Sequence, residues 1–186
     1  MKQLALLEER CESAEIDLLY GDETQVSEEG YVPYGWQFTD ENVCIASAKG
    51  KRINCFGLLS RNNDFIFETT TQTITADFVI EQLDWLSWSI TRHTVIVLDN
   101  ARVHQNKKMK AMQKIWAERG LFIFFLPPYS PHLNIIERLW KEIKIRWLRP
   151  QDYAEDHCLF YSLNRILHAV GNDLTIKFSS FNINLT

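Results

Sequence analysis

Apolar side chains recur along the chain with two periods, which together predict an alternation of strands and helices. Short runs rich in β-branched and aromatic residues predict strands at residues 16–20, 43–48, 52–59, 65–69, 94–98 and 121–126. Apolar positions three and four apart predict helices at residues 1–14, 77–90, 104–119, about 131–147 and 152–170, the last closed by Gly171. Residues 43–59 are expected to form a hairpin around residues 49–51. Residues 172–186 have no clear period, and we expect either a frayed tail or a strand that pairs with a partner.

The order of these elements predicts an α/β fold with a mixed β-sheet flanked by helices. Hairpin-type strands come first, and strands that alternate with helices follow, as in a sheet with both antiparallel and parallel neighbours. We divide the chain into an N-terminal, linker-like helix (1–15), a main domain (16–150) and a C-terminal helix with a tail (151–186). The first helix either leads out of an upstream segment or packs on the main domain.

Composition narrows the class of protein. The 186 residues carry a net charge of -4, so the chain is not a strongly basic nucleic-acid binder and should bind DNA or RNA poorly by itself. The four cysteines form no CxxC pair and favour a reducing cytoplasm over a disulfide scaffold. The sequence has no apolar run long enough to span a membrane, so we expect a cytoplasmic protein with no membrane partner.

Three acidic residues follow or face the predicted strand ends. Asp22 follows the strand at 16–20, Asp99 follows the strand at 94–98, and Glu137 lies in the helix that starts near Pro131. Sites in such sheets form at the carboxyl ends of the strands. Three converging carboxylates repel one another unless a cation joins them, and all-oxygen ligands suit Mg²⁺ or Mn²⁺. Two such ions about 4 Å apart support in-line displacement at phosphorus.

Each acid also has an ordinary structural explanation. Asp22 could be a solvated turn residue, Asp99 a helix N-cap, and Glu137 a first-turn acid favoured by the helix dipole. His104 could contact a metal-bound water or a DNA phosphate, or it could be a hydrogen-bonded structural histidine.

Three sequence blocks resemble the signature blocks of DDE-superfamily transposases. They are residues 20–24 (YGDET), 95–104 (VIVLDNARVH) and 126–140 (LPPYSPHLNIIERLW), and they are most similar to the bacterial insertion-sequence branch allied to Tc/mariner. The resemblance implies a ribonuclease H-like fold. It carries the catalytic and metal-binding triad onto Asp22, Asp99 and Glu137, with two Mg²⁺ or Mn²⁺ ions. The chain departs from the family at Ile135, where Pro is frequent, and at His132, where Asp is common.

The resemblance also implies a function. A transposase domain of this kind would cleave DNA at the ends of a mobile element and join the freed ends to target DNA. Two further sets of residues are candidates for supporting roles. The residues expected to support the acids or to contact DNA are Glu23, Asn100, His104 and Asn134. The residues expected to contact phosphates are Arg102, Lys107, Lys108, Arg138 and Lys141. The alternative for these basic residues is that they form only solvated helix faces.

Relatives in this family usually read the element ends with an upstream helix-turn-helix region. No room for it exists before Ile16, so we expect such a domain in cis or in trans, and a homodimer is possible. The alternatives are another ribonuclease H-like nuclease, or an inactive or regulatory transposase remnant.

Overall fold

The computed structural model describes residues 2–27, 52–101, 106–128, 130–153 and 156–179. The predicted strand at 43–48 and its hairpin turn lie outside these residues, as do Arg102 and His104.

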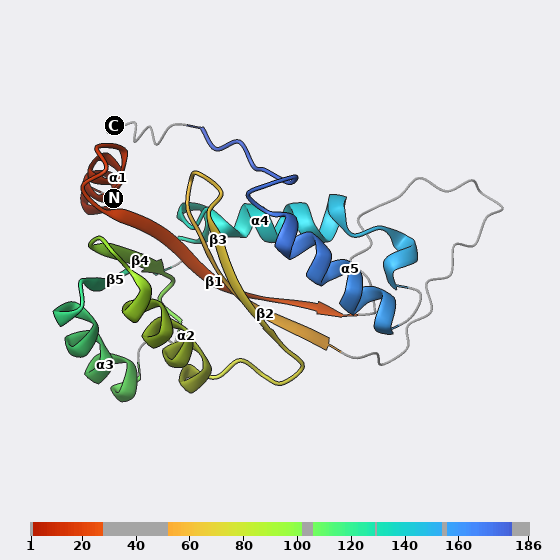
Figure 1. The fold of residues 1–186 in the computed structure, drawn as a ribbon, viewed down its shortest axis with the longest axis horizontal. Coiled ribbons are helices and arrows are strands. Elements are labelled where there is room, and N and C mark those ends of the chain that lie inside the picture. Colours follow the sequence, from red (N-terminus) through yellow and green to blue (C-terminus); the bar gives the residue numbers. More distant parts are fainter. Residues whose placement is uncertain (1, 28–51, 102–105, 129, 154–155, 180–186) are drawn as a thin grey trace.

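A five-stranded mixed sheet forms the centre of the molecule (Figure 1). Its strands lie in the order β3-β2-β1-β4-β5. Their bounds are Asp17–Ser27 for β1, Arg52–Leu59 for β2, Phe65–Thr70 for β3, Thr94–Leu98 for β4 and Leu121–Phe125 for β5. The pairs β1–β2 and β2–β3 are antiparallel, whereas β1–β4 and β4–β5 are parallel. The predicted mixed sheet is therefore confirmed, with β1 as the strand that joins its two halves.

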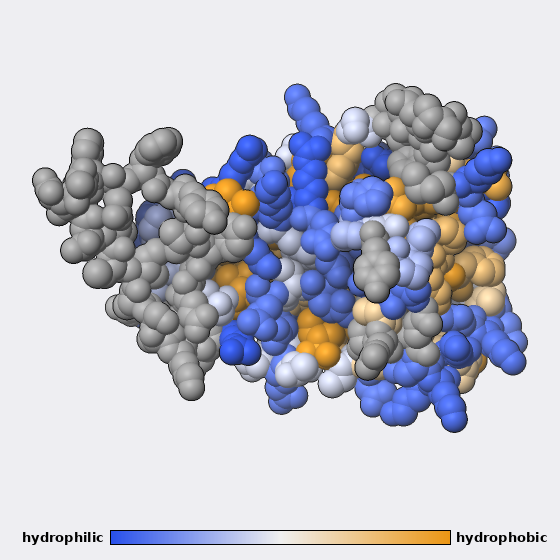
Figure 2. Space-filling view, turned by 180° about the vertical axis from the view of Figure 1, so that it is seen from behind, coloured by the Kyte–Doolittle hydropathy of each residue, from blue (hydrophilic) through white to orange (hydrophobic). Residues whose placement is uncertain are grey.

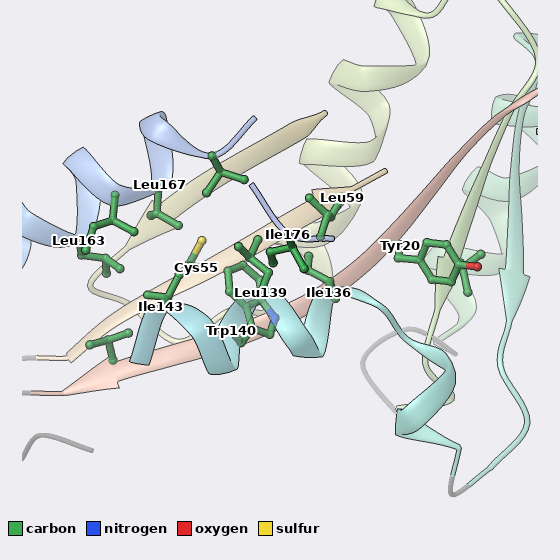
Figure 3. Packing of buried hydrophobic residues seen from close by; sticks show 14 of the residues in the cluster. Tyr20, Cys55, Leu59, Ile136, Leu139, Trp140, Ile143, Leu163, Leu167 and Ile176 are labelled. Carbon is green, nitrogen blue, oxygen red and sulfur yellow. The ribbon is translucent and has the colours of Figure 1, made fainter. Parts of the chain in front are cut away.

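Helices cover both faces of the sheet (Figure 1). On one face, α2 (Ala76–Ser89) and α3 (Lys107–Glu118) bury Leu83 and Trp116 against Ile96 of β4. On the other face, α4 (Ile136–Glu142) and α5 (Asp156–Ala169) pack on β1 and β2, and α1 (Lys2–Glu12) buries Leu4 in the same core. Figure 3 shows the side chains of α4 and α5 meeting over these strands. This packing supports the second reading of the N-terminal helix, which packs on the domain.

Two predicted boundaries near the acids are wrong. The strand predicted to end before Gly21 continues as β1 to Ser27, because its polar second half pairs with β2 from Gly21 to Ser27. The helix predicted to begin near Pro131 begins at Ile136. Pro131 opens a 3₁₀ turn, η2 (Pro131–Leu133), in which the N–H groups of Leu133 and Asn134 donate to the carbonyl oxygens three residues earlier, as in a 3₁₀ rather than an α-helix.

The C-terminal half contains two further departures from regular helix. After α4 the chain makes one π-helical turn, η3 (Ile143–Trp147). The predicted helix at 152–170 is divided into a 3₁₀ turn, η4 (Pro150–Tyr153), and α5. Gly171 closes α5 with φ of 87°, as predicted.

The described part of the tail is fixed to its own chain. Val170 bridges to Leu174, and buried Ile176 exchanges two hydrogen bonds with the side chain of Asn63, at 2.7 and 3.1 Å. Residues 172–179 therefore pack on their own chain, and they run back from α5 toward α1 (Figure 1).

One face of the protein is largely hydrophilic (Figure 2), and the described cysteines are not joined in disulfides. Hydrophilic side chains surround separate hydrophobic patches on the face opposite Figure 1 (Figure 2). No helix in the described ranges is long and apolar enough to cross a membrane. Cys11, Cys55 and Cys158 are free thiols, and Cys44 lies outside the described residues. The cytoplasmic location stays a prediction.

Candidate active site

The strand register places Asp22 and Asp99 at the same level of the sheet. The parallel pair β1–β4 ends at Tyr20 opposite Val97, so two residues further along each chain lie Asp22 and Asp99. Asp99 directly follows β4, whereas Asp22 lies inside β1, where it pairs with Gly57 of β2. Because β4 stops where β1 continues, the side of β1 at Asp22 is left open.

Asn134 connects α4 to the strand that bears Asp22. Its side-chain Nδ2 donates to the carbonyl oxygen of Gly21 at 3.0 Å, and its backbone carbonyl oxygen accepts from the backbone N–H of Glu137 at 3.2 Å. Asn134 is 4% exposed. Through its side chain and its backbone carbonyl, Asn134 thus links the residue before Asp22 to the first turn of the helix that bears Glu137.

Trp140 makes the second connection. Its indole Nε1 donates to Oδ2 of Asp22 at 3.2 Å. The ring lies over Gly57, where a Cβ atom would stand 2.7 Å from the ring's Cη2. Because real Cβ atoms do not approach carbon so closely, a side chain at position 57 would displace the indole. Gly57 therefore makes the space that lets Trp140 reach Asp22.

Asp22, Asp99 and Glu137 line one pocket of about 460 Å³. Asn100 and Asn134 line it too, together with the proline-rich turn after β5. Asp22 and Asp99 are half-buried, and Glu137 is exposed. The carboxylate of Asp99 accepts from the backbone N–H of Ala101 at 3.0 Å, a local turn bond that fixes the chain as it leaves β4.

The pocket disfavours negative charge. Burial, together with the nearby charges of Glu137, Glu23 and Asp99, raises the pKa of Asp22 to about 7. Lys144 lies close enough to interact with these acids: burial lowers its pKa, and the charges of Glu137 and Asp22 offset only part of that lowering. A carboxylate that ionises only near neutral pH, in an acidic pocket, is a place where a cation would be favoured.

The donors suit a divalent cation by type but do not enclose one. All three are carboxylate oxygens, the ligands that Mg²⁺ and Mn²⁺ prefer. In the part of the chain that the structure describes, no three His, Cys, Asp or Glu side chains stand in an arrangement that could hold a metal ion. Asp22 is held by Trp140 and Asp99 by Ala101, so the acids share the pocket without meeting at one point.

The other predicted site residues fall in different places. Asn100 and Asn134 line the pocket, whereas Glu23 does not; strand alternation turns its side chain to the opposite face. Lys107 is exposed at the start of α3, and Lys108 is bound to Asp77 at 2.8 Å. The two cations next to Glu137, Arg138 and Lys141, line a neighbouring cavity with His132.

The positions of Trp140 and Lys144 beside Asp22 and Glu137 were not predicted from the sequence. A usable signal existed, because positions three and seven after Glu137 lie on the same helical face as that glutamate. A tryptophan and a lysine on the face of a predicted acid are candidates for its partners.

Comparison with known proteins reveals the family. The profile of the family described as DDE superfamily endonuclease matches residues 17–158. An uncharacterized protein of Sinorhizobium fredii, y4pE/y4sA, is 38% identical over 71 residues, which are 36% of this chain and 48% of that protein.

Solved structures share the fold at low identity. The Mos1 strand transfer complex matches with a TM-score of 0.54 at 15% identity, over 91% of this chain and 56% of that one. The catalytic domain of Mos1 mariner transposase matches with a TM-score of 0.52 at 13% identity, over 90% of this chain and 84% of that one. The catalytic core domain of BIV integrase matches with a TM-score of 0.50 at 16% identity, over 82% of this chain and 81% of that one.

The chain spans about half the length of y4pE/y4sA and of the Mos1 chain in the strand transfer complex, at 48% and 56%. The likeness confirms the predicted ribonuclease H-like fold, with its mixed sheet between helices. Since the family profile covers most of the chain, including all three acids, this protein belongs to the DDE superfamily endonucleases and has the fold of a transposase and integrase catalytic core.

Proposed function

We propose that this chain is the catalytic part of a transposase, which cleaves DNA at the ends of a mobile element and joins the freed 3′ ends to target DNA. The observation that supports this most directly is that Asp22, Asp99 and Glu137 line one pocket in a DDE superfamily chain. Asp22 and Asp99 come from neighbouring parallel strands and Glu137 from the helix that crosses them.

Asp22, Asp99 and Glu137 are the proposed ligands of two Mg²⁺ or Mn²⁺ ions. When bound, such ions activate an attacking oxygen and stabilise the leaving oxygen of a phosphodiester. The neighbouring residues of the chain orient these ligands: Trp140 fixes one oxygen of Asp22, and Asn134 sets the distance between β1 and the start of α4. Lys144 lowers the cost of gathering negative charge next to the DNA backbone.

Sequence recognition is proposed to belong to a helix-turn-helix domain, in cis or in trans. The net charge of -4 gives the chain little general attraction for DNA, and the matched relatives extend well beyond the matched region. A homodimer is part of the proposal, because joining two element ends to one target needs two sites.

Nicking of supercoiled plasmid tests the assignment. Asp99→Asn removes a charge but little volume, so the variant should fold and lose Mn²⁺-dependent nicking by more than about a hundredfold, since even changes behind metal ligands cost about 10- to 100-fold. Asp173→Asn, in an exposed turn far along the chain, is the matched control and should nick as the wild type does. Undiminished nicking by Asp99→Asn would reject the site.

A second assay separates transposition from plain hydrolysis. A short labelled duplex with a free 3′-hydroxyl is incubated with plasmid, protein and Mn²⁺, and the products are separated by size. Label joined to plasmid supports strand transfer. Nicked plasmid without joined label supports another nuclease of the same fold, and no reaction with a folded wild-type chain supports the inactive remnant.

A further inference from the structure

A second, larger cavity lies directly beside the candidate active site. Its volume is about 760 Å³, and it shares Pro131, Asn134 and Glu137 with the acidic pocket. Its remaining walls come from α4 and η2 on one side, and from Arg61 and the tail on the other. We call it the tail groove, defined by Arg61, His132, Arg138, Lys141, Phe178 and Ser179.

The α4 side of the tail groove carries available positive charge. Arg138 and Lys141 are exposed, and within the described ranges neither has an ion-pair partner. Other basic side chains are engaged: Arg146 binds Glu142 at 3.1 Å, and Lys108, on the other face of the sheet, binds Asp77. The cations that face the groove are thus left for an anionic occupant.

The tail side of the groove presents an aromatic ring in a fixed place. Arg61 donates from Nη1 to the carbonyl oxygen of Ser179 at 3.1 Å, and its guanidinium lies 6.0 Å from the ring centroid of Phe178. The charge of Arg61 is balanced by Glu8, whose Oε2 accepts from Nε at 2.7 Å. Arg61 therefore holds the wall, while Phe178 supplies an apolar surface opposite the free cations.

A buried acceptor marks the boundary between the two cavities. Oδ1 of Asn134 is buried and has no hydrogen-bond partner among the described residues, although Nδ2 of the same amide is bound to Gly21. Buried polar atoms are rarely left unpaired. This oxygen is therefore available to a donor brought by an occupant that passes from one cavity to the other.

We propose that the tail groove binds a single strand of DNA that continues from the candidate active site, with its phosphates on Arg138 and Lys141 and a base against Phe178. This proposal rests on the proposed function and deepens it. Proteins bind single strands by combining a positive groove with aromatic platforms. A cavity of this size holds one small ligand, which corresponds to about one or two nucleotides and excludes a duplex.

The test compares two labelled DNA probes of equal duplex length, one blunt and one with a single-stranded overhang. Fluorescence anisotropy is measured with the full chain, without divalent metal, so that binding is read independently of cleavage. The wild type should bind the overhang probe about fivefold or more tightly than the blunt probe, because one stacked base contributes at least that much.

Variants locate the binding. Phe178→Ala should abolish the preference for the overhang, and Phe178→Leu, which keeps an apolar side chain in the core, should do the same if Phe178→Ala fails to fold. The double variant Arg138→Gln/Lys141→Gln should weaken overhang binding and lower its log–log salt slope by about 1.4, at about 0.7 per contact. Arg146→Gln and Trp85→Ala, which remove a paired cation and an exposed ring elsewhere, should behave as the wild type.

Equal affinity of the wild type for both probes would overturn the proposal, as would an overhang preference that survives in folded Phe178→Leu and in the double variant. Neither result would touch the assignment of the acids, which depends on the nicking assay. Conversely, a folded wild-type chain that fails to nick plasmid but keeps the overhang preference would reject the transposase and leave a strand-binding groove.

Discussion

Asp22 is the described carboxylate whose charge its surroundings disfavour most clearly. It is half-buried in a pocket shared with two other acids, and its pKa is raised to about 7. An acid with a raised pKa in the folded state binds a proton more tightly there than when unfolded. The folded state is therefore more stable at low pH, where Asp22 is protonated, and this stability is lost as pH rises from about 4 to about 7.

Asp22→Asn should remove this pH dependence. At pH 8 without metal the variant should be more stable than the wild type, by up to about 4 kcal/mol, and the difference should shrink toward zero as pH falls to about 4. Thermal unfolding in chelator from pH 4 to pH 8 measures it. Parallel curves for the two proteins would mean that Asp22 is not held in an unfavourable place.

Trp140→Phe isolates the contribution of the indole N–H. The hydrogen bond that Trp140 donates favours the charged carboxylate of Asp22. Without it the pKa of Asp22 should rise by about one unit, since a bond to a charged group contributes about 1.5–3 kcal/mol. The pH above which added Mn²⁺ increases the melting temperature should shift upward by the same amount as this pKa.

Trp147→Phe, a change in a partly buried ring further along the same helical segment, is the control for Trp140→Phe. It should lower the melting temperature without moving that pH. A shift of similar size in both variants would trace the effect to packing rather than to the hydrogen bond.

At the scale of elements, hydrophobic periodicity predicted which segments fold but not where those near the site begin and end. β4 and β5 were predicted because all of their residues after Thr94 are apolar and rich in β-branched or aromatic side chains. The second half of β1 is polar, and only pairing with β2 shows that it is strand. The start of α4 depends on the η2 turn and on a bond to Gly21, 113 residues away in sequence; no local pattern encodes such a contact.

The candidate site was likewise predicted only in part: its acids were predicted, but their contacts were not. The three acids were found because each follows or faces a predicted strand end, and the pocket brings them together. The contact of Trp140 with Asp22 was not predicted, because it depends on the space over Gly57, which lies next to Asp22 only through the pairing of β1 with β2.

Gly57→Ala tests how α4 is placed on the sheet. The added Cβ would stand 2.7 Å from Trp140 and 2.8 Å from Phe65, so we expect a loss of about 1–3 kcal/mol in the free energy of unfolding. In a Trp140→Leu background the cost should fall, which urea unfolding of the four proteins measures as a double-mutant cycle. A cost unchanged by the background would mean that Phe65 alone sets it.

At the scale of the whole molecule, one buried group of side chains joins distant parts of the chain. Glu8 of α1 is 2% exposed, and its carboxylate accepts from the hydroxyl of Tyr20 and from Arg61. Arg61 in turn holds the tail at Ser179. The Glu8–Arg61 ion pair and its hydrogen bonds thus connect the N-terminal helix, the central strand and the tail.

Arg61→Met should destabilise the protein strongly. It leaves the buried carboxylate of Glu8 without its charge partner, which typically costs about 3–5 kcal/mol, and it removes the hydrogen bond that Arg61 donates to Ser179. Arg10→Met breaks the exposed pair with Glu15 and should cost less than about 1 kcal/mol. Urea unfolding measures both, and an Arg61→Met protein as stable as Arg10→Met would contradict the role given to this contact.

The order of the strands also sets when a newly made chain can begin to work. β1 ends at Ser27, yet its parallel neighbour β4 starts only at Thr94, and α4 follows later still. Contacts between segments so far apart form late in folding. During synthesis, Asp22 and Asp99 emerge from the ribosome before the helix that carries Glu137 and orients Asp22 through Trp140. A ribosome-bound fragment ending at β5 should therefore leave DNA uncut.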